Sequence, residues 1–233
     1  VIGYSRFTSS KNDVQASVLT FVPMNDTCEV SQLKLTNNSS EEKTLSVFSY
    51  VEWCLWNADD DSRNFQRNYS TGEVEVVGST IFHKTEYRER RNHYAIYSVN
   101  AEIAGFDTIR EAFLGSYRGA YEPEAVEKGA CTNSMASGWQ PIASHQLNIT
   151  LAPGETKSYV FVLGYIENPE EEKWESYGVI NKTRAYAMLD RYKTDADVEK
   201  AFAELNDYWK KLLSKYTVKS SNDKVDRMVN IWN

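Results

Sequence analysis

Residues 50–76 read YVEWCLWNADDDSRNFQRNYSTGEVEV, and they predict two β-strands joined by a long polar segment. The segment carries three consecutive carboxylates, two arginines, several amide side chains and Phe65. Sugar hydroxyls both donate and accept hydrogen bonds, and the apolar face of a sugar ring stacks on aromatic side chains. The composition therefore favours a pocket for a sugar or another polyhydroxyl ligand, with a plain solvated loop as the alternative.

Outward from this stretch, apolar and alternating runs predict that residues 1–167 form a mainly β, antiparallel β-sandwich domain. The turn at Pro153-Gly154 separates the clearest pair of strands, because Pro and Gly suit the central positions of a tight turn. The second half of the strand at 44–56 is apolar on both faces, which predicts burial between two layers. The predicted strands are residues 14–22, 30–36, 44–56, 72–77, 80–85, 94–99, 147–151 and 159–166.

Residues 100–142 break this pattern and hold many of the glycines. We predict a long loop region there, with at most one short helix near residues 108–113. A loop of this length in a compact domain is usually functional or lies at an interface.

From Asn168 onward, helix-forming residues replace the β-branched runs, and residues 168–220 are interpreted as a helical linker. A helix is predicted over residues 177–192. Thr194 begins a second helix as its N-cap, and its apolar stripe continues to Tyr216. A further helix in residues 221–233 is interpreted as the start of another domain. With no initial Met, and with this amphipathic pattern still running at residue 233, we interpret the chain as a piece of a longer protein.

Composition and charge exclude several classes of function. The 233 residues carry a net charge of −7 and no basic run, which argues against nucleic-acid binding. No apolar run is long enough to cross a membrane, and the N-terminus does not resemble a signal peptide. The 3 cysteines are widely spaced without a C-x-x-C motif, which predicts reduced thiols in the cytoplasm and no zinc site.

A metal site is not expected in the polar segment either. Asp59, Asp60 and Asp61 suggest a calcium loop, but no glycine stands at the position of the sharp turn that such a loop requires. Solvation and loop capping are the expected roles of these three carboxylates.

Four strings together resemble a known family. They are YSRFT at 4–8, FSYVEWCLWN at 48–57, NFQRNYSTGEVE at 64–75 and RMVNIWN at 227–233. The strings resemble cellobiose phosphorylases, in the disaccharide-phosphorylase group of glycoside hydrolase family 94. The resemblance covers essentially the whole chain in the same order, and the two longest strings are too specific for chance.

The resemblance implies an N-terminal β super-sandwich of the galactose-mutarotase type, a helical linker, an α/α-barrel catalytic domain and a C-terminal sheet. Family members cleave cellobiose with inorganic phosphate as co-substrate, and they release α-glucose 1-phosphate and glucose with inversion. The aspartate that acts as general acid and the phosphate site belong to the barrel, so we expect no catalytic residue here. No cofactor is expected. The implied assembly is a homodimer, and the implied location is the cytoplasm.

The resemblance also implies that residues 57–67 reach the acceptor glucose. Arg67 and Gln66 are the strongest candidates for substrate binding, followed by Asn64 and Asn57. Their chemistry agrees, because Arg67 offers a rigid fork of donors to neighbouring hydroxyls. The amides each combine one acceptor with two donors.

Two other functions stay open at this point. A mutarotase-like sugar epimerase needs a histidine facing a glutamate across a pocket, for which His93 or His145 is available, with ordinary structural histidines, His83 among them, as the alternative. A stand-alone carbohydrate-binding module would use exposed aromatic platforms. Trp174 and Trp139 are candidates for that role, with structural packing as the alternative.

Overall fold

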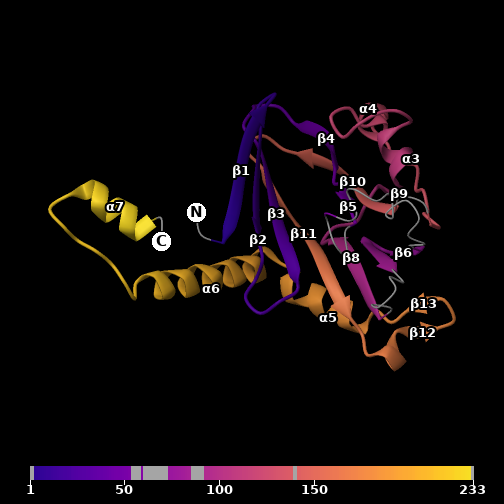
Figure 1. Cartoon of the computed structure of the whole chain (residues 1–233). Coiled ribbons are helices and arrows are strands. Elements are labelled where there is room, and N and C mark those ends of the chain that lie inside the picture. Colours follow the sequence, from indigo (N-terminus) through magenta and orange to yellow (C-terminus); the bar gives the residue numbers. More distant parts are fainter. Residues whose placement is uncertain (1–2, 54–58, 60–72, 85–91, 139–140, 232–233) are drawn as a thin grey trace.

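The structure is a computed structural model that describes residues 3–53, 59, 73–84, 92–138 and 141–231. Two antiparallel sheets pack face to face, and helices lie against the outer face of the larger sheet (Figure 1). The larger sheet contains, in chain order, β1 (Tyr4–Lys11), β2 (Val14–Phe21), β3 (Cys28–Asn37), β6 (Glu73–Val77), β7 (Thr80–Lys84), β8 (His93–Val99) and β11 (Thr156–Glu167). Their spatial order is β1-β2-β3-β11-β8-β7-β6. The predicted antiparallel sandwich is confirmed.

The smaller sheet contains β4 (Lys43–Phe48), β5 (Val51–Glu52), β9 (Gly105–Ile109) and β10 (Pro141–Leu151). Its order is β4-β10-β5, and β9 also pairs with β10. In β10 the side chains of Leu147, Ile149 and Leu151 are buried and those of the residues between them are exposed, as the alternation predicted. The strand is longer than predicted, because it already begins at Pro141.

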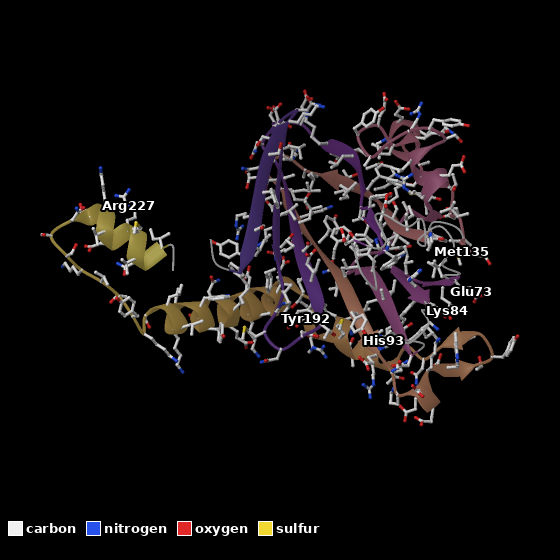
Figure 2. The ribbon with its side chains drawn as sticks, viewed as in Figure 1. Glu73, Lys84, His93, Met135, Tyr192 and Arg227 are labelled. Atoms are coloured by element: carbon white, nitrogen blue, oxygen red, sulfur yellow. The ribbon has the colours of Figure 1, made fainter. Side chains whose placement is uncertain are left out.

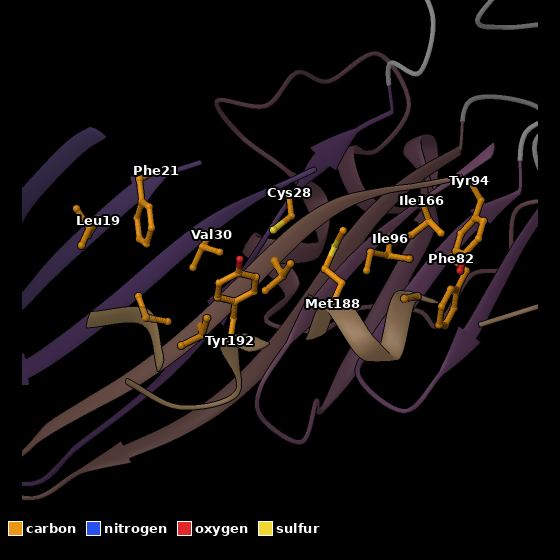
Figure 3. Packing of buried hydrophobic residues seen from close by; sticks show 14 of the residues in the cluster. Leu19, Phe21, Cys28, Val30, Phe82, Tyr94, Ile96, Ile166, Met188 and Tyr192 are labelled. Atoms are coloured by element: carbon orange, nitrogen blue, oxygen red, sulfur yellow. The ribbon is translucent and has the colours of Figure 1, made fainter. Parts of the chain in front are cut away.

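Strand β8 shows why the middle of the larger sheet reads as a continuous apolar run. Tyr94 and Ile96 pack under the helices, whereas Ala95 and Tyr97 point into the layer between the two sheets. All of β8 is buried, since both faces of the sheet are covered. Figure 3 shows the helix-side cluster, in which Met188 lies between the strands and the helices.

The predicted strand over 44–56 is wrong as one continuous element. It divides into β4 and β5, which both pair with β10. At the break the Ser49 side chain accepts a 3.0 Å hydrogen bond from the His145 amide, where a strand carbonyl would otherwise be the acceptor. A side chain that substitutes for the backbone interrupts the ladder, and apolar periodicity does not reveal this.

The region 100–142 is more regular than predicted. Helix α3 (Arg110–Leu114) confirms the expected short helix, but β9 and α4 (Glu124–Lys128) were not predicted. Strand β1 was also missed, although the two turn residues that follow it, Asn12 and Asp13, have the positive φ typical of a tight hairpin.

The helical region begins later than predicted. Residues 174–180 form a hairpin of β12 (Trp174–Ser176) and β13 (Val179–Ile180) around Gly178, with the short turns η1 (Glu170–Glu172) before it and η2 (Asp190–Tyr192) after α5. Helix α5 runs over Thr183–Leu189, so the predicted helix over 177–192 is wrong in its first residues. The short turn through Gly178 returns the chain on itself, which a helical pattern count does not detect.

Helix α6 (Asp195–Leu213) begins as predicted, because Thr194 and Asp197 exchange side-chain and backbone hydrogen bonds in a capping box. Its residues Val198 and Leu205 are buried against the sheet. Helix α7 (Asp223–Ile231) also forms, with no buried residue. No helix in the described parts of the chain has the length and apolarity to cross a membrane.

Gly164 in β11 sets how closely α5 approaches the larger sheet. A Cβ at this position would lie 2.6 Å from Met188 Sδ and 2.8 Å from Ile96 Cγ1. We expect Gly164→Ala to lower the free energy of unfolding by about 1–3 kcal/mol, because both neighbours are packed in the core. Urea denaturation measures this. Gly154→Ala is not a suitable control because its φ is positive, so Ala152→Gly in the exposed turn serves instead.

Candidate functional site

The predicted sugar-binding residues Arg67, Gln66, Asn64 and Asn57 lie outside the described residues, so their roles stay predictions. The structure does describe both ends of the segment that carries them. Strand β5 and Trp53 lead into it, and β6 begins at Glu73 directly after it. Figure 2 shows Glu73 and Lys84 close together at one end of the sandwich. This end of the molecule is the candidate site.

The chain enters the polar segment after Trp53, and aromatic packing inside the sandwich holds this end of the segment. Trp53 is buried and stacks on His83 of β7, with ring centroids 5.3 Å apart and an interplanar angle of 18°. Burial lowers the pKa of His83 to about 4, so its ring is neutral at physiological pH. A large aromatic side chain locked in this way fixes where the chain leaves the sheet.

A second anchor on the incoming side involves Glu52. Its Oε1 accepts a 2.6 Å hydrogen bond from the Tyr50 hydroxyl and a 2.9 Å hydrogen bond from Arg110 Nε of α3. The Tyr50 ring stacks on Phe113, 5.1 Å away. Burial, together with the neighbouring Glu52, raises the pKa of Tyr50, which therefore stays a hydrogen-bond donor. These contacts join Tyr50 and β5 to α3, the helix that follows β9 of the smaller sheet.

The other end of the polar segment, where β6 begins, is held by a buried charge network centred on Glu75. Lys84 Nζ lies 3.1 Å from Glu75 Oε1, and Lys182 Nζ forms an ion pair with Oε2. The Ile180 amide donates a 2.8 Å hydrogen bond to Glu75 Oε1. Burial raises the pKa of Glu75, but the hydrogen bonds from Lys182, Ile180 and Lys84 outweigh it and hold the pKa below its ordinary value. Glu75 is therefore ionised and is no candidate for a general acid.

The same network fixes the β12–β13 hairpin beside the site. Lys84 Nζ donates a 2.7 Å hydrogen bond to the Gly178 carbonyl in the hairpin turn, and Lys182 Nζ donates one of 3.0 Å to the Ile180 carbonyl. Lys173 Nζ lies 4.5 Å from the centroid of the Trp174 ring. Trp174 keeps 38% of its surface exposed. Its role as a sugar platform stays a prediction, and Trp139 lies outside the described residues.

A polar cleft of about 570 Å³ lies elsewhere, between the β2–β3 connection and the start of α6. Asp26 is its most buried carboxylate, and it accepts hydrogen bonds from Arg191, from the Tyr192 hydroxyl and from the Thr27 amide. Burial raises the pKa of Asp26, but these bonds outweigh it and the pKa lies below its ordinary value. The cleft was not predicted from the sequence. Its lining residues are Met24, Asn25, Asp26, Arg191, Tyr192, Asp197, Lys200, Ala201 and Glu204.

The histidines proposed for a sugar epimerase are placed differently from what that reaction needs. His145 has no exposed surface and stacks between the sheets on Tyr97, with centroids 5.0 Å apart. His93 is buried at the end of β8, bonded to Tyr165 and 3.5 Å from Glu167. Neither histidine lines the described cleft. The geometry of the described residues gives the epimerase no support.

Comparison with known proteins identifies the fold family. Residues 1–195 match the family described as "Glycosyl hydrolase 94, supersandwich domain". The chain belongs to this family. The glycosyl hydrolase 94 match includes every described anchor of the candidate site, from Glu52 to Lys182.

Relatives in this family include phosphorylases with different sugars in their names. The chain is 29% identical to an N,N'-diacetylchitobiose phosphorylase from Vibrio proteolyticus, over 99% of this chain and 27% of the relative. It is 25% identical to a solabiose phosphorylase from Paenibacillus borealis, over 99% of this chain and 28% of that protein. The chain thus spans little more than a quarter of the length of these curated relatives.

A solved structure supports the same architecture. A protein described as a kojibiose phosphorylase from the human microbiome superposes with a TM-score of 0.52 at 11% sequence identity. The match covers 86% of this chain and 22% of that protein. At this identity the likeness concerns the fold alone.

Proposed function

We propose that this glycosyl hydrolase 94 domain belongs to an inverting disaccharide phosphorylase and contributes one wall of its acceptor-sugar subsite. The observation that carries the proposal is the family match over residues 1–195, joined to a polar segment anchored at both ends. Cellobiose is the proposed substrate, and inorganic phosphate is the co-substrate. The curated relatives that act on chitobiose and solabiose support the reaction class.

In the proposed reaction, phosphate oxygen attacks the anomeric carbon of the glycosyl unit while the bond to the leaving sugar breaks. A carboxylic acid gives its proton to the leaving oxygen, so the products are α-glucose 1-phosphate and glucose. Phosphate is already an anion, so the reaction requires no second carboxylate to activate a water molecule. The reaction therefore requires one carboxylic acid whose pKa is raised above its ordinary value.

The four described carboxylates whose pKa is perturbed do not suit that acid. Those with a resolved shift, Asp26, Glu75, Glu124 and Asp197, all have pKa values below the ordinary one. They are ionised at neutral pH and cannot donate a proton to a leaving group. We place the acid outside this domain, in the remainder of the full-length protein, which we propose to be a homodimer in the cytoplasm.

Arg67→Ala in the full-length enzyme is expected to raise KM for the acceptor glucose in the synthetic direction by about 10–100-fold. The reason is the loss of charge-assisted hydrogen bonds, each contributing roughly 1.5–3 kcal/mol. KM for glucose 1-phosphate should change by less than about threefold, because the donor sugar does not contact this segment. Initial rates at varied acceptor and donor concentrations measure both constants.

Arg63→Ala is the matched control, because Arg63 belongs to the same polar segment but lies outside the NFQRN string. It should leave both constants near their original values. Equal rises in KM for the donor and the acceptor in Arg67→Ala would contradict the assignment of this segment to the acceptor subsite. Release of glucose from cellobiose without phosphate would contradict the reaction class itself.

A further inference from the structure

The polar cleft at the start of α6 is separate from the candidate site. It lies between the β2–β3 connection, η2 and the first half of α6, whereas the polar segment is anchored at β6 and β7. In the larger sheet β11, β8 and β7 stand between β3 and β6, and Figure 2 shows Tyr192 of the cleft well apart from Glu73 and Lys84. The cleft volume of about 570 Å³ falls within the roughly 300–1,000 Å³ typical of small-molecule sites. The cleft is therefore large enough for a ligand of its own.

The floor of the cleft is fixed before any ligand arrives. The Asp26 side chain is only 8% exposed, and its Oδ2 accepts hydrogen bonds of 2.9 Å from Arg191 Nε and 2.6 Å from the Tyr192 hydroxyl. Its Oδ1 accepts hydrogen bonds of 2.9 Å from Arg191 Nη2 and from the Thr27 amide. Arg191 Nη1 donates a further hydrogen bond of 3.0 Å to the Ala187 carbonyl. Asp26 and Arg191 thus hold each other in place, and a site that is ordered in advance loses less entropy on binding.

One face of α6 forms a wall of the cleft and offers polar groups to a ligand. Asp197, Lys200, Ala201 and Glu204 lie three or four residues apart along this face. Asp197 is engaged in the capping box. Within the described part of the chain, the side chains of Lys200 and Glu204 form no hydrogen bond or ion pair, and neither does that of Asn25 in the β2–β3 connection. These three side chains are therefore available to a ligand.

The charges in the cleft disfavour an ionic ligand. Arg191 is committed to Asp26 and to a backbone carbonyl, which leaves the Lys200 ammonium as the available cation of the cleft. On the α6 face Lys200 stands between Asp197 and Glu204, so an anion would meet carboxylates on both sides of it. A metal ion is disfavoured as well, because the described residues contain no group of three or more His, Cys, Asp or Glu side chains that could hold one. A neutral molecule that both donates and accepts hydrogen bonds can use charges of both signs.

We infer that the cleft binds a neutral mono- or disaccharide, in a site distinct from the proposed acceptor subsite. Lys200 and the Asn25 amide donate hydrogen bonds to sugar hydroxyls, and Glu204 accepts hydrogen bonds from them. Met24 and Ala201 add apolar surface against which the C–H face of a sugar ring packs. The bound sugar bridges the β2–β3 connection and α6. Nothing in this site depends on the phosphorylase reaction proposed above.

Methyl NMR of the full-length protein, labelled with ¹³C at its methionine methyl groups, tests the proposal with glucose as the probe. We expect the Met24 signal, assigned by its loss in Met24→Leu, to shift along a saturating curve with a Kd of about 10 mM or below. No shift, or a shift that grows linearly without saturation, would overturn the proposal. Met135 reports separately on the candidate site, because it lies two residues before Ser137, which forms a β-bridge with Glu73. A saturating shift of Met135 alone would overturn the sugar site in the cleft and leave the proposed acceptor subsite intact.

Charged sugars test the class of ligand. At about pH 6, cationic glucosamine and anionic glucuronate should each shift the Met24 signal with a Kd at least about fivefold higher than that of glucose, because each meets like charges in the cleft. Equal or tighter binding of either charged sugar would show that the cleft is an ionic site and would contradict the proposal.

Substitutions in α6 provide an independent check. In Ala201→Trp the indole fills the cleft, so the Kd for glucose at Met24 should rise by at least about tenfold. Ala203→Trp is the matched control, because Ala203 belongs to the same helix but is exposed and does not line the cleft. It should change the Kd by less than about twofold. Glu204→Ala removes an exposed side chain with little risk to folding, and it should raise the Kd by about 3–10-fold through the loss of a charged acceptor. An unchanged Kd in both Ala201→Trp and Glu204→Ala would place the sugar elsewhere and overturn the proposal.

Discussion

Acidification from about pH 6.5 to about pH 4 is expected to remove roughly 3 kcal/mol of stability for each of His83 and His145. Burial lowers the pKa of both rings from 6.5 to about 4. The unfolded chain therefore takes up protons near pH 6.5, whereas the folded protein does not until about pH 4. The contribution of each neutral histidine is complete above pH 6.5 and is lost as the pH falls through this window.

The variant His83→Phe isolates one of the two histidines. Neither ring nitrogen of His83 has a hydrogen-bond partner within the described part of the chain, so phenylalanine removes no hydrogen bond there. A phenyl ring keeps the stacking on Trp53. We expect the variant to be at least as stable as the wild type at pH 7. Between about pH 6.5 and about pH 4, its unfolding should take up about one proton fewer. Urea denaturation at several pH values measures the slope, and an unchanged slope would contradict the assignment.

The buried histidines also show what sequence patterns convey about this fold. Residues 80–85 and 94–99 were predicted as strands because their apolar residues form short runs. His83 did not disturb that prediction, since one polar residue in a strand is usually assigned to the solvent side. The structure places it inside the sandwich, stacked beneath Trp53. The positions of these two strands followed from local pattern, whereas the face on which a polar residue such as His83 lies depends on which layer covers it.

Errors in the predicted elements have a similar origin. The break between β4 and β5 depends on Ser49 and His145, which are far apart in sequence and meet only in the folded sandwich. The hairpin at residues 174–180 is short, and it is held by Lys84 and Lys182 rather than by its own composition. In contrast, the N-cap at Thr194 and the turn at Gly154 were predicted correctly, because local hydrogen bonds and positive φ determine them.

The candidate site likewise combines features that local sequence conveys with contacts that only the fold creates. Residue types alone indicated a polar segment suited to a sugar, and the family strings selected Arg67 and Gln66 within it. The anchors of that segment could not be selected in this way. Glu75 alternates with valines in a strand pattern that predicts a solvated carboxylate. Of its lysine partners, Lys84 lies on the next strand, β7, and Lys182 lies far away along the chain. Only the fold brings these charges together.

Glu75→Gln is accordingly expected to lower the free energy of unfolding by about 3–5 kcal/mol. The side chains of Lys84 and Lys182 are 6% and 7% exposed, so loss of the carboxylate leaves two ammonium groups buried without their shared partner. The matched control is Glu73→Gln. Glu73 also lies 3.2 Å from Lys84, but its side chain is 63% exposed, and an exposed ion pair contributes at most about 1 kcal/mol.

A double variant separates the loss of charge balance from the loss of packing. In Glu75→Gln combined with Lys182→Met, one buried cation is removed with its partner, so the double variant should be less destabilised than the sum of the two single variants. Chemical denaturation of all four proteins gives the coupling energy. Strict additivity would mean that the network does not act as a unit. If the network does act as a unit, weakening it should also loosen the β6 end of the polar segment that carries Arg67. KM for the proposed acceptor sugar should then rise in the Glu75→Gln variant of the full-length protein but not in the Glu73→Gln variant.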